Sequence, residues 1–262
     1  MRVARRILLA LLIVSLAAAG ARAQTPRAPA QPQPPPNRPF VERGFVSLNL
    51  GGQFSPGELS DRVTFEANAE TGTLDADYSG RSALVFDGGS GLLVYRQIGV
   101  GFGVSHSGRS GSAFVRAQVP HPFFDDRHRA VEGDASDISR RETAVHAQVY
   151  YEFRHRGPWR VRLFGGPSYV RVEQELVTGV ETQETFPFDT AAFARTTTER
   201  AKGSAFGGHA GLDISRMMSR RLGLGASLRY TGVSIGLNVP GGRDVSTDGG
   251  GLTAGLGLRV AF

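Results

Sequence analysis

The chain of 262 residues contains no cysteine, which excludes disulfide bridges, thiolate metal sites and a thiol nucleophile. It also has few charges, since Asp, Glu, Lys and Arg together make up only 21% of the residues. After Arg43 no apolar run approaches 18 residues, so no transmembrane helix is expected. What the chain has in quantity is glycine, with 35 residues.

The formal net charge of +6 comes mainly from the N-terminus. Four of the 30 basic residues fall in the first 23 positions, which contain no acid, so 26 basic and 24 acidic residues remain, a net charge of +2. A chain this close to neutrality has no phosphate-binding footprint. We therefore expect no nucleic-acid partner.

The N-terminal segment has the pattern of a secretory signal. Three arginines precede an apolar run from Ile7 to Ala19, and Ala21-Arg22-Ala23 forms a small-x-small cleavage site. The run is too short to span a bilayer as a helix. Residues 1–23 are thus predicted to be a removed signal peptide, residues 24–39 a proline-rich periplasmic linker in an extended conformation, and residues 40–262 the folded domain.

The folded domain is dominated by alternation of apolar and small or polar residues with period two, which predicts strands. In residues 252–262, for example, Leu, Ala, Leu, Leu, Val and Phe alternate with Thr, Gly, Gly, Arg and Ala. Seven windows show the pattern: 45–51, 99–104, 143–153, 159–169, 206–214, 222–230 and 252–262. Residues 83–95, which are rich in glycine and show it ambiguously, are interpreted as the eighth strand, with Leu84, Phe86, Leu92 and Val94 on the apolar face. We expect strands of about 10 to 14 residues, joined by short turns that alternate with long loops at 55–80, 107–140, 177–201 and 234–249.

The minor face of these strands is Gly, Ala and Ser with a few charges, which fits the crowded interior of a narrow barrel. The large apolar residues then face hydrocarbon, and a closed barrel is the β-structure that satisfies every backbone group there. The fold class predicted is all-β, an eight-stranded antiparallel up-and-down transmembrane β-barrel. Aromatic residues are expected in girdles at the strand ends: Tyr95, Trp159, Tyr169, Tyr230 and Phe262. A soluble lipocalin-like binding barrel is the alternative.

The signal peptide, the alternating strands, the alternation of long and short loops and the final Leu258-Arg259-Val260-Ala261-Phe262 resemble the small outer-membrane β-barrel family, the OmpA-like and opacity-protein-like group. The segments 164–170 and 206–211 also look like strands of such domains. The resemblance implies location in the outer membrane of a Gram-negative-type bacterium, with both termini in the periplasm. It further implies that the terminal Phe262 is the signal read by the barrel-assembly machinery.

Strand parity places a set of charged residues inside the barrel. The predicted ion-pair network of the lumen is Asp87, Glu152, Arg160, Arg162, Asp213, Arg229 and Arg259, with His146 and His209 on the same face. Three acids nearly balance four bases, as a low-dielectric interior requires. The network is interpreted as a plug, and a narrow gated pore is the alternative.

Catalytic and metal-binding alternatives have weaker patterns. His106-Ser107 suggests a lipid A-modifying hydrolase, but parity points His106 away from the lumen, and a serine nucleophile needs a histidine and an acid. His121 with residues 123–128 could bind a divalent metal, although such loop residues are usually just solvated. No cofactor, catalytic residue or metal site is assigned, and the protein is predicted not to be an enzyme.

The predicted function is therefore a contribution to envelope structure, or to surface interactions through the long loops. The partners expected are outer-membrane lipid and lipopolysaccharide, besides the assembly machinery. The loop residues expected to meet the lipopolysaccharide are Arg127, His128 and Arg129 with Asp125, Asp126, Glu132 and Asp134. The barrel is expected to be a monomer, and the sequence names no external partner.

Overall fold

The computed structural model describes residues 43–55, 59–79, 82–154, 157–239 and 244–262. All of them belong to a compact unit that begins at Phe40. The signal peptide and the linker predicted for residues 1–39 lie outside the described residues. In the part of the chain that the structure describes, no helix is long and apolar enough to cross a membrane.

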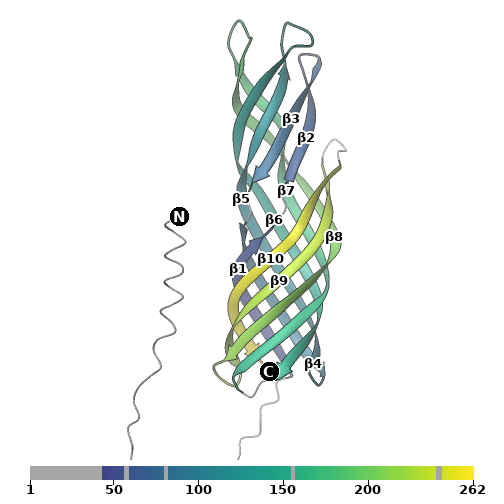
Figure 1. Ribbon diagram of the computed structural model, residues 1–262, viewed down its shortest axis with the longest axis vertical. Coiled ribbons are helices and arrows are strands. Elements are labelled where there is room, and N and C mark those ends of the chain that lie inside the picture. Colours follow the sequence, from purple (N-terminus) through teal and green to yellow (C-terminus); the bar gives the residue numbers. More distant parts are fainter. Residues whose placement is uncertain (1–42, 56–58, 80–81, 155–156, 240–243) are drawn as a thin grey trace, which may run out of the picture. The chain divides into compact units, whose positions relative to one another are not determined.

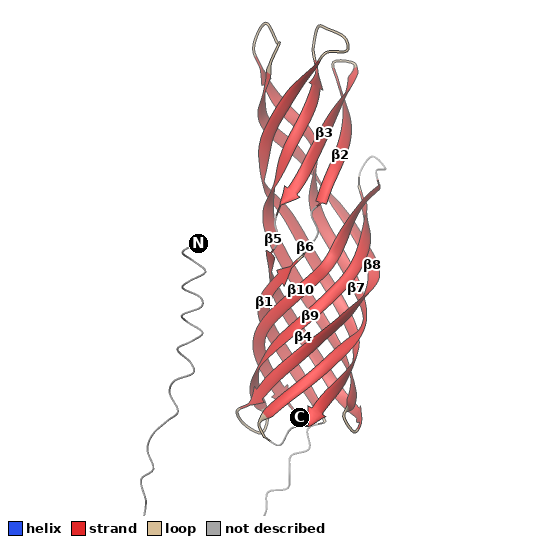
Figure 2. Ribbon diagram, viewed as in Figure 1, coloured by secondary structure: helices blue, strands red, loops and turns tan. Residues whose placement is uncertain are grey.

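The described residues form ten strands and no helix. Figure 2 shows the strands in red. The strands are β1 (Gly44–Phe54), β2 (Leu59–Ala67), β3 (Glu70–Ser79), β4 (Ser82–Tyr95), β5 (Ile98–Pro120), β6 (His128–Arg154), β7 (Trp159–Glu184), β8 (Ala191–Met217), β9 (Leu222–Asn238) and β10 (Asp244–Ala261). Every pairing between them is antiparallel.

Eight of the strands close into a ring in the order β1, β4, β5, β6, β7, β8, β9, β10 and back to β1. The eight-stranded antiparallel barrel predicted from the sequence is thus confirmed. The last residue, Phe262, lies at the end where the short turns are, next to Gly44 (Figure 1). We call the other end of the barrel the distal end.

The expectations for all four long loops were wrong, since the expected loop 234–249 also contains the end of β9 and the start of β10. Residues 107–140 and 177–201 are mostly strand, because β5 to β8 run for 23 to 27 residues and continue far beyond the ring. The expected loop 55–80 contains the hairpin of β2 and β3. β3 pairs with β5 from Ser79 opposite Ser112, just beyond the point where β4 leaves β5 at Leu84 opposite Gly108 (Figure 1).

The barrel therefore has two parts. The membrane ring consists of β1 and β4 with the parts of β5 to β10 that lie beside them. The distal extension consists of β2, β3, residues 108–141 and 172–203, and the adjoining distal ends of β9 and β10. Figure 1 shows the hairpin of β2 and β3 beside the distal half of β5.

In the membrane ring the large apolar side chains point outward, as the sequence predicts. Leu48 is 62% exposed and Leu256 is 70% exposed. In water such a surface would be unstable, whereas in hydrocarbon it is solvated by lipid. This outer belt excludes the soluble lipocalin-like alternative, in which the same residues would line the core. The predicted girdle residues are all exposed at the ends of the belt.

The distal extension has the opposite arrangement. Leu74, Val115 and Leu176 are fully buried in one apolar core, together with the smaller residues around them. Tyr78 of β3 reaches across this core, and its hydroxyl oxygen accepts the backbone N–H of Val177 at 2.7 Å. The outside of the extension is polar. We did not expect a packed apolar interior here, since these residues were interpreted as loops.

A bend in β10 joins the two parts. Gly250 and Gly251 have φ angles of +84° and +109°, a conformation that residues with a Cβ rarely adopt. Gln53 Nε2 donates to the Gly250 carbonyl oxygen at 2.6 Å, and Glu142 Oε1 accepts the Gly250 N–H at 2.8 Å. These bonds fix β10 where it leaves the edge of β1.

Candidate functional site: the charged lumen

The lumen of the membrane ring contains buried ion pairs. Arg162 of β7 donates from Nε to Glu152 of β6 at 2.7 Å, and its Nη1 lies 3.7 Å from Asp213 of β8. Arg259 of β10 donates from Nε to Asp213 Oδ2 at 3.0 Å, and its Nη2 pairs with the same carboxylate. Arg162 and Arg259 are almost completely buried. Asp213 therefore holds two buried guanidinium groups.

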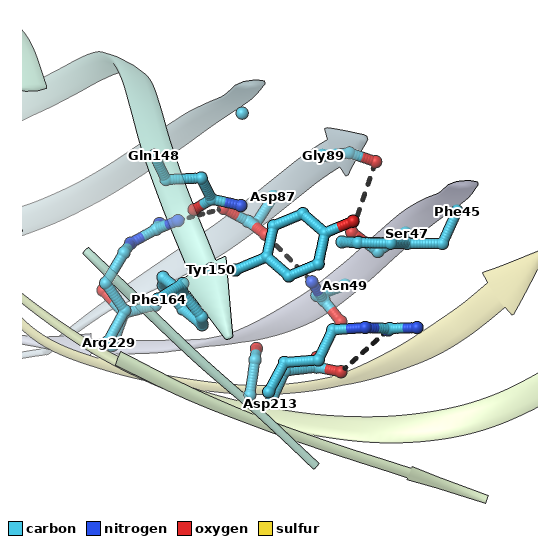
Figure 3. Close-up of a pocket in the computed structure, with 15 residues that line it drawn as sticks. Phe45, Ser47, Asn49, Asp87, Gly89, Gln148, Tyr150, Phe164, Asp213 and Arg229 are labelled. Carbon is cyan, nitrogen blue, oxygen red and sulfur yellow. Dashed lines mark hydrogen bonds and ion pairs between the residues drawn. The ribbon is translucent and has the colours of Figure 1, made fainter. Parts of the chain in front are cut away.

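An asparagine connects this group to a second ion pair. Arg259 donates from Nη1 to Asn49 Oδ1 at 2.7 Å, and Asn49 Nδ2 donates to Asp87 at 2.9 Å. Asp87 also accepts from Arg229 Nη1 at 2.7 Å. Figure 3 shows these side chains in the lumen. A continuous chain of polar contacts thus crosses the lumen from β6 through β7, β8, β10, β1 and β4 to β9.

Arg160 occupies a different place from the other residues of the predicted network. Its side chain is only half-buried, and Nη1 donates to the carbonyl oxygens of Gly157 and Trp159 at 3.2 and 3.3 Å. The reason is its position at the start of β7, beside the short turn, where solvent replaces the lumen. Six of the seven predicted residues are brought together, and Arg160 lies at the rim.

Aromatic rings close the space around these charges. The guanidinium of Arg162 lies 4.0 Å from the centroid of the Phe45 ring, and the Phe45 and Tyr150 rings pack edge to face at 5.4 Å. Figure 3 shows Phe45, Tyr150 and Phe164 around the remaining space. That cavity has a volume of about 40 Å³, enough for a few water molecules and too small for a hydrated channel.

A layer of histidine and serine side chains follows on the distal side. His146 Nε2 lies 3.0 Å from Ser105 Oγ, and Ser168 Oγ lies 2.8 Å from Nδ1 of both His146 and His209. A hydrolytic serine needs a histidine that an acid orients, and an opening for substrate. Within the described residues, the hydrogen bonds of these histidines go to serines and no ion pair joins them to a carboxylate, and Ser168 is almost fully buried. The arrangement links the two histidines through Ser168 and is not a catalytic triad.

The pair singled out in the sequence, His106 and Ser107, is divided between the two faces of β5. His106 is exposed and bonds to Thr143 Oγ1 at 3.0 Å, whereas Ser107 is buried. The parity argument against this pair is confirmed, and the two side chains cannot act on one substrate atom.

A third polar layer lies where the ring meets the distal extension. Arg140 donates from Nη1 to Gln174 at 2.7 Å and to Thr247 Oγ1 at 2.9 Å, and its Nη2 lies 3.7 Å from Glu142. Glu142 also accepts from Gln53 Nε2 at 3.1 Å. These contacts join four strands, β1, β6, β7 and β10, across the interior.

Sequence reasoning missed this third layer and also Asn49. The predicted strand began at Thr143, one residue after Glu142. Extending its alternation toward the N-terminus would have placed Glu142 and Arg140 on the inner face. Asn49 was placed on the inner face, but only charged residues were considered as members of the network.

The metal alternative concerned the loop between β5 and β6. His121 is buried there, and its Nε2 lies 4.0 Å from Asp189. Its Nδ1 accepts the backbone N–H of Phe123 at 3.1 Å. Within the described residues, no group of three or more His, Cys, Asp or Glu side chains is placed to hold a metal ion.

An apolar outer belt, a closed antiparallel ring and a charged, side-chain-filled lumen together define a transmembrane β-barrel of the outer-membrane type. Phe262, the expected assembly signal, lies exposed at the end of the last strand. Its recognition by the assembly machinery stays a prediction.

Comparison with known proteins gives matches among solved structures only. No family model and no curated protein matches the chain. The outer membrane protein OprG from Pseudomonas aeruginosa is 10% identical with a TM-score of 0.47, covering 84% of this chain and 97% of that chain. Neisserial surface protein A is 12% identical with a TM-score of 0.38, covering 84% and 95%. The outer membrane protease OmpT from Escherichia coli is 10% identical with a TM-score of 0.45, covering 86% and 98%. Nothing about the function of this chain follows from these likenesses.

Proposed function

We propose that this protein is a non-enzymatic outer-membrane barrel whose lumen is closed and whose distal extension presents a rigid surface outside the cell. The observation that carries the proposal is the unbroken chain of contacts from Glu152 to Arg229 across the lumen. Charge-assisted hydrogen bonds of this kind are short and strong in a low dielectric. Opening a pore would require several of them to break together.

The apolar core of the distal extension supports the same conclusion. Side chains from β2, β3 and β5 to β8 fill the interior beyond the ring. A pore would need water along this core, which would remove the hydrophobic stabilisation of the extension. The narrow gated pore is therefore the less favoured function.

Hydrogen bonds tie the turns at the distal tip together. Glu70, beside the turn between β2 and β3, accepts the N–H of Asp126 at 2.9 Å. Arg129 of β6 donates to Glu184 of β7 at 2.7 Å and to the Pro120 carbonyl oxygen at 2.9 Å. With short turns on the periplasmic side, this tip lies outside the cell.

The tip exposes a group of aromatic side chains: Phe123, Phe124 and Phe186 are 70%, 55% and 82% exposed. The Phe123 ring packs edge to face on Phe188 at 5.4 Å, which joins the two loops. Exposed aromatic residues on a preorganised support are typical of interaction surfaces. We infer that surface interactions of this protein are made here.

Planar-bilayer recording of the purified barrel tests the closed lumen. The unmodified protein should show at most small, infrequent conductance. Glu152→Ala removes a partner of the buried Arg162, so openings should become more frequent and the unfolding temperature should fall. A large, stable conductance of the unmodified protein would overturn the proposal.

Adherence of cells that produce the protein tests the surface role. Replacing Phe123, Phe124 and Phe186 with Ala should reduce adherence and leave the barrel folded. The matched control replaces Gln118, Asp134 and Thr197, three exposed polar residues of the extension, with Ala. Equal adherence of both variants and the unmodified protein would indicate a purely structural role.

A further inference from the structure

Exposed basic residues gather on one side of the barrel, just beyond the apolar belt. On β7 the belt ends at Tyr169, and the next outward residue is Arg171; on β8 it ends at Phe206, and Lys202 and Arg200 follow Ser204. Register joins them to β6, because Arg141 lies opposite Glu173, which lies opposite Lys202. We call Arg141, Arg171, Arg200 and Lys202 the basic patch.

Two acids share the surface of the patch without neutralising it. Glu173 lies 3.2 Å from Arg171 and 3.6 Å from Lys202, and Glu175 lies 3.1 Å from Arg200. Four basic and two acidic side chains leave a local charge of +2. The three paired basic side chains are each at least half exposed, so their remaining N–H groups can reach a further anion.

Among the described residues, the outward positions of β9 and β10 beyond the belt carry no basic side chain. Beyond Tyr230, the last belt residue on β9, the described outward residues are Gly232, Ser234, Gly236 and Asn238. On β10 the exposed residues before the belt begins at Leu252 include an acid, Asp248. If these residues only kept the surface soluble, any polar residue would suffice on every side of the barrel. Solvation therefore does not explain why basic residues are concentrated on β6, β7 and β8.

The position of the basic patch relative to the apolar belt indicates the kind of ligand it binds. Outward positions on a strand are about 6.6 Å apart, so the patch lies within a few such steps of the hydrocarbon edge. That is the layer of the lipid headgroups, where basic side chains bind anionic lipid. The outer girdle residue Tyr169 is fixed there by its hydroxyl, which donates to Ser204 Oγ at 2.9 Å.

We propose that the basic patch binds the phosphate groups of an anionic lipid of the outer leaflet, with the lipid's acyl chains along the apolar belt of β6 to β8. This places the lipopolysaccharide contact on the barrel wall, away from the loop residues expected from the sequence. Of those residues, Arg129 lies on β6 and is buried against Glu184, and Arg127 is paired with Asp189 at 3.0 Å. The proposal does not depend on the lumen being closed.

The test measures lipid binding by the folded full chain in a zwitterionic detergent. Native mass spectrometry counts the lipids retained during titration with purified lipid A, in its phosphorylated form and after its phosphates are removed. The patch variant combines Arg141→Gln, Arg171→Gln, Arg200→Gln and Lys202→Gln. The control variant, Arg62→Gln with Arg116→Gln, Arg127→Gln and Arg195→Gln, loses the same charge from exposed positions of the extension.

We expect the patch variant to bind phosphorylated lipid A roughly tenfold more weakly, or worse, while the control changes by less than about twofold. Equal weakening in both variants would show that only net charge matters and would overturn the proposal. Equal binding of the dephosphorylated lipid by the unmodified protein would overturn it as well. This last comparison needs no variant and holds even if the patch variant fails to fold.

Discussion

Along β7 the inward and outward faces exchange their character: polar side chains face inward in the membrane ring, and apolar side chains face inward in the distal extension. In the membrane ring the inward residues are Arg162 and Ser168, and the outward ones include Leu163 and Tyr169. A few residues further the inward residues are Val170, Val172 and Leu176, whereas the outward ones are Arg171, Glu173 and Glu175. The pairing of β7 with β8 continues without a break from Trp159 to Val177, across the change from one part to the other.

The difference shows that the solvent outside decides the pattern and the backbone does not. In the extension, water is outside, so apolar side chains gain free energy by moving inside. In the ring, lipid is outside and offers apolar groups the same environment as a core, so that the interior can hold charges if they are paired. One continuous sheet therefore joins a core stabilised by apolar burial to a lumen stabilised by ion pairs.

Breaking one ion pair in each part should give the largest difference in lost stability between the membrane ring and the distal extension. Asp213→Ala leaves the buried Arg259 without a carboxylate, which we expect to destabilise the ring by about 3–5 kcal/mol. Asp77→Ala removes the partner of Arg116 on the surface of the extension, at an expected cost of about 1 kcal/mol or less. Thermal loss of the heat-modifiable band on a denaturing gel measures the effect in the ring.

The double variant Asp213→Ala with Arg259→Met is the control for this prediction, since it removes both charges and should recover much of the lost stability. A loss for Asp77→Ala as large as that for Asp213→Ala would contradict the contrast between the two environments.

The same apolar truncation should have different effects in the two parts. Leu176→Ala leaves a void in the core of the extension, which we expect to cost about 2–5 kcal/mol. Leu224→Ala, at a lipid-facing position that is 52% exposed, should cost about 1 kcal/mol, because detergent or lipid fills the space. Limited proteolysis of the folded barrel in detergent reports opening of the extension. Equal protease resistance of both variants would show that the core of the extension is not tightly packed.

An arginine introduced on the outer surface of each part compares what surrounds the two parts. Leu256→Arg puts a guanidinium on the apolar belt, and we expect destabilisation of about 2–4 kcal/mol in a bilayer. Gln118→Arg puts the same group on the exposed surface of the extension and should change stability by no more than about 0.5 kcal/mol. Folding titrations in urea with lipid vesicles measure both. A tolerated Leu256→Arg would mean that this face does not contact hydrocarbon.

Much of the membrane ring was predictable, because its inner and outer faces differ in a way that period-two alternation records. Leu252 to Phe262 showed it over a whole strand. The charged members of the lumen followed from the same parity, whereas their pairing did not, since register between strands leaves no mark in a single sequence. That is why the link from Arg259 through Asn49 to Asp87 came only from the structure.

The distal extension was harder to predict, for physical reasons. Alternation is interrupted by irregular pairing between Gly111 and Ala113, and residues 195–200 of β8 are polar on both faces. Its core also contains small residues such as Ala113 and Ala117, which give a weak signal. The apolar side chains of this core come from several segments that are distant in the sequence. Each segment therefore looks like a loop when it is considered alone.

The smallest effect we predict is the response of the extension to acid through Glu175. Its pKa is held below the usual value by the backbone N–H of Ser139, which donates to the carboxylate at 2.9 Å, and by the side chain of Arg200. A carboxylate with a depressed pKa in the folded state stabilises the fold above its unfolded pKa of about 4.5, and this contribution is lost as the pH falls through the folded pKa. Glu175→Gln should therefore destabilise the extension by less than about 1 kcal/mol at pH 7 and by a smaller amount at pH 3. Protease resistance in a zwitterionic detergent at the two pH values measures this, with Glu199→Gln, at an exposed position of β8, as the control. A deficit of Glu175→Gln that stays constant or grows on acidification would show that Ser139 and Arg200 do not select the ionised carboxylate.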